Sequence, residues 1–278
     1  MKSAISNNLT QPVVTQAVKK LNDASSNATK VLFLGYKENE THIIKSLIDK
    51  DCAVWHTEDK IQSTIGFDMV VSFGYRHILK KEVITSSPAP IVNLHISYLP
   101  FNRGAHPNFW SFFDGTPSGV SIHLIDEGID TGPVLFQRYV NFEKEEKTFM
   151  QTYKRLICEI EDLFMGNIDP IVLNKLEPKP QRRKGTHHKV SDLPKDFAGW
   201  GSIIDVEIDR LEGIIKDDKA AKLKLIDEIE IIRTANNVNW MDLLRLAFRE
   251  APEQAKELIK RINIDDRKIA DLFAKLGE

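Results

Sequence analysis

The sequence has little of what several protein classes require. Its 278 residues include only two cysteines, Cys52 and Cys158, each in an apolar context. Two such distant thiols do not make a disulfide framework, so we expect two buried free thiols in a reducing compartment. No apolar run approaches the roughly 20 residues that span a bilayer. The start of the chain also lacks the basic-then-apolar pattern of a secretion signal. We therefore expect a cytoplasmic protein with no membrane partner.

Several functional signatures are missing as well. The formal net charge is only −2, which gives no general reason to expect a nucleic-acid partner. The sequence has no Gly-x-Ser-x-Gly elbow, no P-loop and no Gly-x-Gly-x-x-Gly fingerprint. It also has no Cys-x-x-Cys or His-x-x-x-His pair, and the adjacent His187 and His188 are poorly placed to chelate one ion. We expect no metal.

What the sequence does contain is an alternation of strand and helix patterns from Lys30 onward. Apolar runs predict strands over 30–36, 52–56, 67–73 and 89–95, with helices near 43–48 and 78–84 between them. Such alternation predicts an α/β fold with a parallel sheet. Two further strands, 119–125 and 133–142, are expected to pair antiparallel around the loop 126–132, before a helix over 148–164.

The two ends of the sequence differ from this middle part. Residues 1–28 are Ser/Asn-rich and predict one short amphipathic helix, Val13–Leu21, as an appendage. Residues 167–193 are expected to be irregular. Beyond Trp200, apolar residues recur at helical spacing through 203–215, 223–232, 240–248, 255–262 and 269–276. We therefore predict three parts: a helical extension 1–28, a catalytic domain 29–200 and a small helical domain 201–278.

The residues that carry chemistry are Asn93, His95 and Asp130. Asn93 and His95 are two apart in a predicted strand, so their side chains point to the same face. Asp130 follows in a loop flanked by Gly128 and Gly132, which allow sharp bends and close approach to a ligand. An amide and an imidazole can donate to an oxyanion, while His95 or Asp130 can accept a proton. This combination suits an amine attacking a formyl group.

These residues resemble the 10-formyltetrahydrofolate-dependent formyltransferases. The resemblance lies in Asn93-x-His95-x-Ser97-x-Leu99-Pro100, then Arg103-Gly104, then Asp130-Thr-Gly132, and it covers roughly 30–193. It implies a Rossmann-like core, 10-formyltetrahydrofolate as formyl donor, and Asn93, His95 and Asp130 as catalytic residues. Lys147-Thr148, opening a helix, and Gln181 with Gly185–His188 resemble the closing segment of that domain.

The resemblance also implies a pterin pocket formed by two segments, 73–79 and 126–132. Its expected lining residues are Phe73, Gly74, Tyr75, Ile78, Leu79, Asp126, Gly128, Ile129 and Gly132. The expected contacts to the second substrate are Ser97, Arg103, Gly104, His106 and Arg182.

Several of these residues have a second interpretation. Ser97 could instead bond nearby backbone, and His106 could simply precede the helix that begins at Pro107. The basic run 182–184 could bind a diphosphate or be a solvated loop. His123 and the aromatic residues of 109–113 are expected to be structural. Trp240 could belong to a small core of the tail or to a surface that forms a homo-oligomer or binds a partner.

The acceptor is predicted by elimination among relatives. The tail is helical and slightly acidic, unlike the basic β-rich domain of the methionyl-tRNA enzymes, and residues 1–28 are too short for a regulatory domain. What remains is most similar to the sugar N-formyltransferases, which act on UDP- or dTDP-linked amino sugars for surface polysaccharides. Formylation of another small amine, such as hydroxyornithine, and a non-catalytic scaffold that recruits a partner through the helical tail stay open as alternatives.

Overall fold

A computed structural model describes residues 18–235 and 240–277 of the chain. The chain divides into two compact units, with the boundary between Ile208 and Asp209. The first unit contains the sheet and the candidate site, and the second is helical. The three-part division predicted at 28 and 200 stays a prediction.

The first unit is built on a seven-stranded sheet in the order β1-β3-β2-β4-β5-β7-β8. Its strands are β1 (Lys19–Lys20), β2 (Lys30–Gly35), β3 (Ala53–Thr57), β4 (Met69–Phe73), β5 (Ile91–His95), β7 (Gly119–Leu124) and β8 (Val134–Tyr139). The central strands β3, β2, β4 and β5 are parallel, and β7 and β8 add antiparallel at one side. The predicted α/β class and the antiparallel pair are confirmed.

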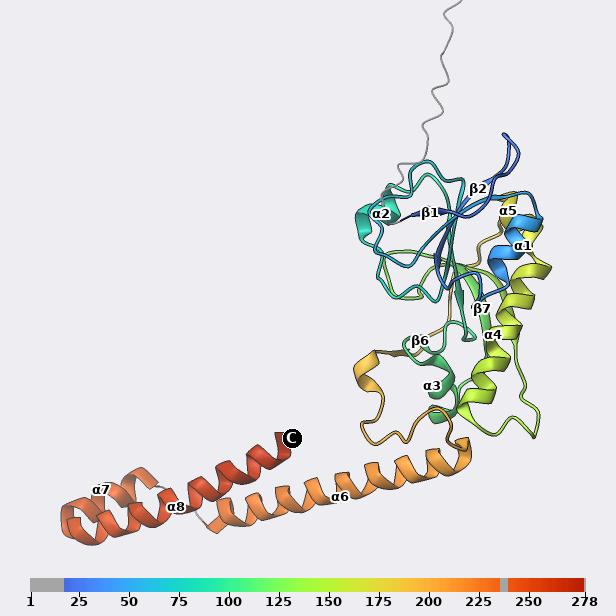
Figure 1. Ribbon diagram of the computed structural model, residues 1–278. Coiled ribbons are helices and arrows are strands. Elements are labelled where there is room, and N and C mark those ends of the chain that lie inside the picture. The colour runs from blue at the N-terminus through green and yellow to red at the C-terminus, as the bar shows by residue number, and fades with distance from the viewer. Residues whose placement is uncertain (1–17, 236–239, 278) are drawn as a thin grey trace, which may run out of the picture. The chain divides into compact units, whose positions relative to one another are not determined.

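The helices of this unit cover both faces of the sheet. They are α1 (Ile43–Asp49), α2 (Lys81–Thr85), α3 (Pro107–Phe113), α4 (Phe149–Gly166) and α5 (Ile168–Val172). Helices α1, α4 and α5 lie along one face and α2 along the other (Figure 1). A small second sheet pairs β6 (Arg103–Gly104) with β9 (His187–His188), and a 3-10 turn follows at Val190–Asp192.

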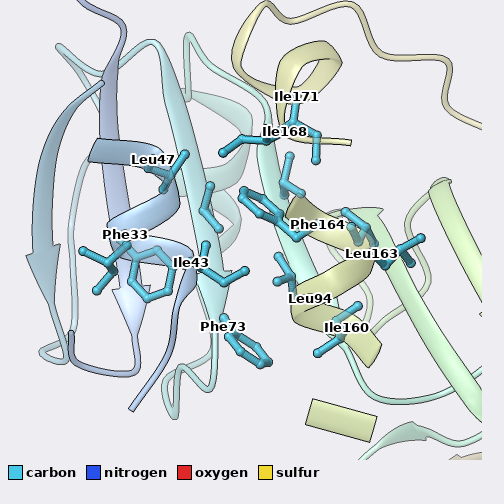
Figure 2. Packing of buried hydrophobic residues seen from close by; sticks show 14 of the residues in the cluster. Phe33, Ile43, Leu47, Phe73, Leu94, Ile160, Leu163, Phe164, Ile168 and Ile171 are labelled. Carbon is cyan, nitrogen blue, oxygen red and sulfur yellow. The ribbon is translucent and has the colours of Figure 1, made fainter. Parts of the chain in front are cut away.

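The larger core lies between the sheet and the α1–α4–α5 layer. Phe33 and Phe73 from the strands meet Ile160 and Phe164 of α4 and Ile171 of α5 (Figure 2). The strands are almost entirely apolar because both of their faces are buried, as is usual for central parallel strands. Burial of this apolar surface is the main force that fixes the sheet, and therefore the strand ends that carry the site.

Three predictions about local structure are wrong. Most of the helix expected over 13–21 lies outside the described residues, but Lys19–Lys20 is an edge strand that pairs antiparallel with β3. The flanking Val18 and Leu21 pack against the two cores, which explains why this segment adds to the sheet. The helix expected over 78–84 is shortened to α2, and Ile78 is 76% exposed. The irregular stretch 167–193 contains α5.

The thiols also differ from the expectation. Both cysteines are free, but only Cys52 is buried, while Cys158 is exposed on α4. Apolar neighbours in sequence do not determine burial on a helix, because positions one residue apart point in different directions.

The second unit consists of long helices. Five helical segments were predicted beyond Trp200, and within residues 201–235 and 240–277 the structure has three helices: α6 (Ile204–Ala235), α7 (Trp240–Glu250) and α8 (Pro252–Gly277). Pro252 begins α8, a position that suits proline because its ring fits the first helical turn. Among residues 18–235 and 240–277, no helix is long and apolar enough to cross a membrane. Whether Trp240 packs in the tail or forms an interface stays open, since its side chain lies outside the described part.

Candidate active site

A cavity of about 440 Å³ opens where β4 and β5 end and the chain turns away from the sheet. The carboxyl ends of parallel strands are the usual place for a ligand in an open α/β sheet. Asn93, His95 and Asp130 all line this cavity, as does His123. The volume lies within the range of small-molecule sites.

Strand register explains why three of these side chains meet. Asn93 and His95 are two apart on β5 and share a face, and His123 of the neighbouring β7 is paired directly with Asn93. The Asn93 amide nitrogen lies 3.1 Å from His123 Nε2. The rings of His95 and His123 stand nearly perpendicular, with centroids 6.3 Å apart. The sheet therefore presents an amide and two imidazoles as one group.

Asp130 reaches this group from the loop between β7 and β8. Its Oδ2 lies 3.6 Å from His95 Nε2 and its Oδ1 lies 3.4 Å from His123 Nε2. The backbone N–H of Gly104 donates to Oδ2 at 2.8 Å. Asp130 has a positive φ of 52°, a conformation that Asp tolerates better than most residues. The loop backbone is thus turned so that one carboxylate faces both histidines.

The pKa of the Asp130 carboxyl group results from opposing effects. Burial raises it, but the charges of His95 and His123, the hydrogen bond with His123 and the N–H of Gly104 together hold the pKa well below its usual range. Attraction to nearby positive charge and hydrogen bonds to the charged form both favour a carboxylate. Asp130 is therefore an anion at neutral pH, and a poor acceptor of a proton.

The hydrogen-bond partners of His95 fix its tautomer. Its Nε2 lies 3.1 Å from the carbonyl oxygen of Asn102. Because a carbonyl oxygen can only accept, Nε2 carries the hydrogen, and Nδ1 is the basic nitrogen of the neutral ring. The side chain of Asn102 is in turn bound to Thr116 and Thr186. His95 is thus oriented by a buried backbone carbonyl and is free to accept a proton.

Asn93 has one amide hydrogen that can serve a ligand. In His123, Nδ1 donates to the carbonyl of Leu124 at 2.8 Å, so Nε2 accepts from Asn93 when the ring is neutral and faces Asp130 Oδ1 with a hydrogen when the ring is protonated. The second contact of the same amide nitrogen is with Asp130 Oδ1 at 3.5 Å, the limit of a hydrogen bond. The weakly held hydrogen is the one available to an oxygen atom in the cavity.

Most residues predicted for the pterin pocket line this same cavity. Those that do are Phe73, Gly74, Tyr75, Ile78, Leu79, Asp126, Gly128 and Ile129. Gly132 lies beside the cavity rather than in its lining, and a Cβ there would sit 1.8 Å from the carbonyl oxygen of Leu124. Gly128 is similarly constrained, since a Cβ would sit 2.0 Å from Thr131 Oγ1. The loop 126–132 therefore depends on both glycines.

The structure does not bring together all the residues that were predicted to contact the second substrate. Gly104 lines the cavity, and Arg103 beside it donates twice to the Gln181 side-chain oxygen, at 3.2 and 2.7 Å. Ser97 and His106 do not line it. The Ser97 hydroxyl donates to the carbonyl of Phe101, and the His106 ring lies against Trp200, where burial lowers its pKa.

Arg182 is exposed, as are its neighbours 183 and 184, and it does not line the cavity. The aromatic residues of α3 are structural, as expected. Phe109 is fully buried against Phe149 and Phe197.

Two contributors to the site were not recognised in the sequence. His123 was expected to be structural, yet it contacts both Asn93 and Asp130. Gln181 binds the backbone carbonyls of Asp130 and Gly132, at 2.9 and 2.7 Å, and so holds the loop that carries the carboxylate. For His123 a signal existed: Ser121 and His123 alternate with apolar residues in a buried strand. For Gln181 no local pattern indicates a partner some fifty residues away.

The fold and the cavity agree with a family comparison. A family model described as formyl transferase matches residues 15–164, which is more than half of the chain. This protein belongs to the formyl transferase family.

Individual relatives give two kinds of similarity. The methionyl-tRNA formyltransferase of Thermodesulfovibrio yellowstonii is 35% identical over 131 residues, which are 47% of this chain and 41% of that protein. The chain thus matches about two fifths of the length of such curated relatives. The formyltransferase PseJ of Anoxybacillus kamchatkensis is 36% identical, with a TM-score of 0.58 over 63% of this chain and 96% of that one. That enzyme was solved with a UDP-linked 4-formamido sugar and tetrahydrofolate.

A third similarity concerns the fold alone. A 4-N formyltransferase of Francisella tularensis matches 59% of this chain and 77% of its own, with 21% identity and a TM-score of 0.51.

Proposed function

We propose that this protein is an N-formyltransferase that moves a formyl group from 10-formyltetrahydrofolate to the amine of a nucleotide-linked amino sugar. The observation that carries the proposal is the convergence of Asn93, His95 and Asp130 at one wall of the cavity. The sugar acceptor is supported by the 36% identity to an enzyme solved with a UDP-linked formamido sugar, almost all of which this chain covers.

The same cavity suits a folate donor. Its lining includes the rings of Phe73 and Tyr75, the side chains of Ile78 and Leu79 and exposed backbone of Gly74. Flat aromatic and apolar walls with a few backbone groups are suitable for a heterocyclic ring system. We propose that this side binds the folate, with the residues predicted for it in the sequence, and that no metal takes part. Among the described residues, no cluster of His, Cys, Asp and Glu could hold a metal ion.

In the proposed reaction, the acceptor nitrogen attacks the formyl carbon and a new C–N bond forms. Collapse of the tetrahedral intermediate breaks the bond between that carbon and N10 of the folate, and N10 takes up a proton. The amide hydrogen of Asn93 donates to the oxyanion while it exists. His95 accepts the proton that the amine loses, because the pKa of Asp130 is held too low for that carboxylate to serve as base. Asp130 stabilises the resulting imidazolium.

Arg103 and Gly104 are proposed to position the acceptor. The Arg103 guanidinium is held by an uncharged partner, Gln181, so its positive charge is available to a phosphate group. Gly104 follows directly and lines the cavity. Ser97, His106 and Arg182 lie outside the lining, and their contact with the acceptor stays a prediction.

The experiment is an acceptor screen with purified protein. Tetrahydrofolate release from 10-formyltetrahydrofolate is followed with UDP- and dTDP-linked amino sugars, hydroxyornithine and methionyl-tRNA, each with wild type and with His95→Ala as inactive control. We expect release with a nucleotide-linked amino sugar only. Turnover on hydroxyornithine alone would reject the sugar acceptor, and full biological activity of the His95→Ala protein would favour a scaffold.

Methionyl-tRNA is included because the curated relatives carry that activity in their names. Binding of tRNA depends steeply on salt, since counterions are released from phosphates. A formylation rate with methionyl-tRNA that falls strongly between 50 and 200 mM salt would assign the protein to that reaction instead.

A further inference from the structure

The lining of the cavity comes from both faces of the sheet. Tyr75 and Leu79 pack with the apolar cluster on the α2 face, and they belong to the side, segments 75–79 and 126–129, that is proposed to hold the folate. Tyr36 and Ile157 pack with the apolar cluster on the α1–α4–α5 face, and the lining of this second side also includes Tyr153, Ala105 and Pro107. Two substrates that exchange one carbon must approach it from different directions. The second side is therefore where the acceptor lies, if the proposed function is right.

Two tyrosines from distant segments meet on this second side. Tyr36 directly follows β2, and Tyr153 lies in the first turns of α4. Their hydroxyl oxygens are 2.9 Å apart, a normal hydrogen bond. The pair joins the end of the sheet to the helix that covers it, 117 residues later in the chain.

The position of the Tyr36 ring is tightly determined. It stands edge-on to Phe73, with centroids 4.8 Å apart and an interplanar angle of 87°. It also lies over Gly74, whose φ is +69° and whose added Cβ would come within 2.6 Å of the ring. A glycine at this position leaves the space that the ring occupies. Such a fixed aromatic side chain can present its hydroxyl group with little loss of entropy on binding.

The pair has unused hydrogen-bonding capacity. Two hydroxyl groups carry two donors and four lone pairs, and their mutual bond uses one of each. No other hydrogen bond of either hydroxyl is formed among the described residues of the chain. Burial, together with the bond to Tyr36, raises the pKa of Tyr153, so the Tyr153 side chain remains a neutral hydroxyl at physiological pH. One O–H and several lone pairs are left for a ligand in the cavity.

We infer that the Tyr36–Tyr153 pair is the element that selects the acceptor, by binding an uncharged polar substituent of its sugar ring. This inference rests on the proposed function. The side chains on this side of the cavity are aromatic, apolar or small, and none of Tyr36, Tyr153, Ile157, Ala105 and Pro107 carries a charge. A hydroxyl or acetamido group fits such a site, whereas a diphosphate would find no cationic partner among these residues.

The test uses Tyr36→Phe and Tyr153→Phe, which remove one hydroxyl each and keep the ring. With the nucleotide-linked sugar that wild type uses, we expect the acceptor KM to rise about 3- to 10-fold, as for the loss of one uncharged hydrogen bond. The KM for 10-formyltetrahydrofolate should stay within about twofold, because that substrate lies on the other side. In the double variant, the acceptor KM should rise by less than the product of the two single increases, since the two hydroxyls share one hydrogen bond.

The matched control is Tyr139→Phe. Tyr139 is 56% exposed, stacks on Tyr98 at a centroid distance of 3.7 Å and does not line the cavity. Its hydroxyl should be dispensable for both KM values. A second measurement pairs each Phe variant with acceptors that lack one ring substituent. If a tyrosine binds a ring substituent, its Phe variant should show no rise in KM with the acceptor that lacks this substituent. A purely structural role would leave the rise in KM the same with every acceptor.

The possible results separate the two hypotheses. Phe variants with unchanged acceptor KM but a lowered melting temperature would overturn the inference and leave the pair as a tie between β2 and α4. The proposed function would survive that result. Wild-type protein that turns over no nucleotide-linked amino sugar would overturn the proposed function and the inference with it, and this is seen before any variant is compared.

Discussion

The unit that ends at Ile208 and the unit that begins at Asp209 differ in how they use apolar side chains. In the first, two continuous clusters fill both faces of the sheet, and many side chains are fully buried. Among the second-unit residues whose side chains the structure describes, the buried apolar ones are few, and they include Leu211 and Ile229 on α6 and Ile269 on α8. Large apolar side chains are exposed there instead, at Ile214, Ile215, Leu223, Ile226, Ile231, Leu246, Phe248, Ile264 and Phe273.

This difference shows what a polar site requires. The candidate site places a carboxylate, an amide and two imidazoles in a largely buried position, which is costly unless every group is bound. The Asp130 carboxylate has four such partners or neighbours, and three of them, Asn93, His95 and His123, come from the strands β5 and β7 of the main sheet. Long helices with a thin core form from local periodicity but offer no comparable frame. Four predictions test this contrast.

The largest effect is expected at His95. His95→Ala should lower kcat/KM for formyl transfer about 100- to 10,000-fold, because the base that accepts the amine proton is removed. Steady-state kinetics with the acceptor identified in the screen measures this. The control is His42→Ala, since His42 is exposed ahead of α1 and its side chain forms no cap. Equal activities of the two variants would contradict the assignment of His95.

The next largest effect is on stability, and it compares a buried position of the first unit with an exposed position of the second. Phe164→Ala removes a fully buried ring from the α4 layer and should lower the free energy of unfolding by about 3 to 5 kcal/mol. Ile231→Ala, at a position that is 69% exposed in the helical unit, should change it by less than about 0.5 kcal/mol. Urea unfolding followed by circular dichroism gives both values. A large loss for Ile231→Ala would show that the exposed face is covered in solution.

The third prediction concerns the carboxylate between the histidines. The pKa of Asp130 is lower in the folded protein than in the unfolded chain. Its stabilising contribution is therefore complete above the unfolded pKa of about 3.9 and is lost as the pH falls through the folded value. The difference in unfolding free energy between wild type and Asp130→Asn should narrow by roughly 1 to 2 kcal/mol between pH 5.5 and pH 3.

Urea midpoints at the two pH values provide the measurement. Asp68→Asn is a matched control, because Asp68 only accepts from the backbone N–H of Lys30 at an exposed position. If the difference in unfolding free energy between wild type and Asp130→Asn stays constant or widens toward pH 3, the carboxyl group of Asp130 is not held in its charged form.

The smallest effect is expected at the start of α4. Thr148 and Gln151 form a reciprocal capping box, in which each side chain accepts from the other's backbone N–H. Thr148→Ala should cost about 1 kcal/mol of unfolding free energy. Thr85→Ala is the comparison, because the Thr85 hydroxyl only donates back to Lys81 within α2. A similar loss at both positions would mean that the cap does not anchor the helix that carries Tyr153.

Much of the first unit could be predicted because its signals are local. The apolar runs that became β2 and β4 are buried on both faces, and the two-residue spacing of Asn93 and His95 alone placed them on one face. The Lys147-Thr148 motif also indicated where a helix begins, since α4 starts at Phe149 with Thr148 as its cap. By contrast, Lys19–Lys20 looked helical and became a strand, because the available edge of β3 outweighed a weak local preference.

The sequence by itself determined the α/β class, because strand and helix patterns are only a few residues long. Through its resemblance to a family, it also predicted the three candidate catalytic residues and two segments that line the cavity. Only the tertiary structure decided that His123 faces Asn93 across two strands, that Gln181 holds the Asp130 loop, and that Tyr36 meets Tyr153. These contacts join segments 30 to 117 residues apart. No local pattern encodes such a pairing, since it exists only once the sheet has set its strand order and register.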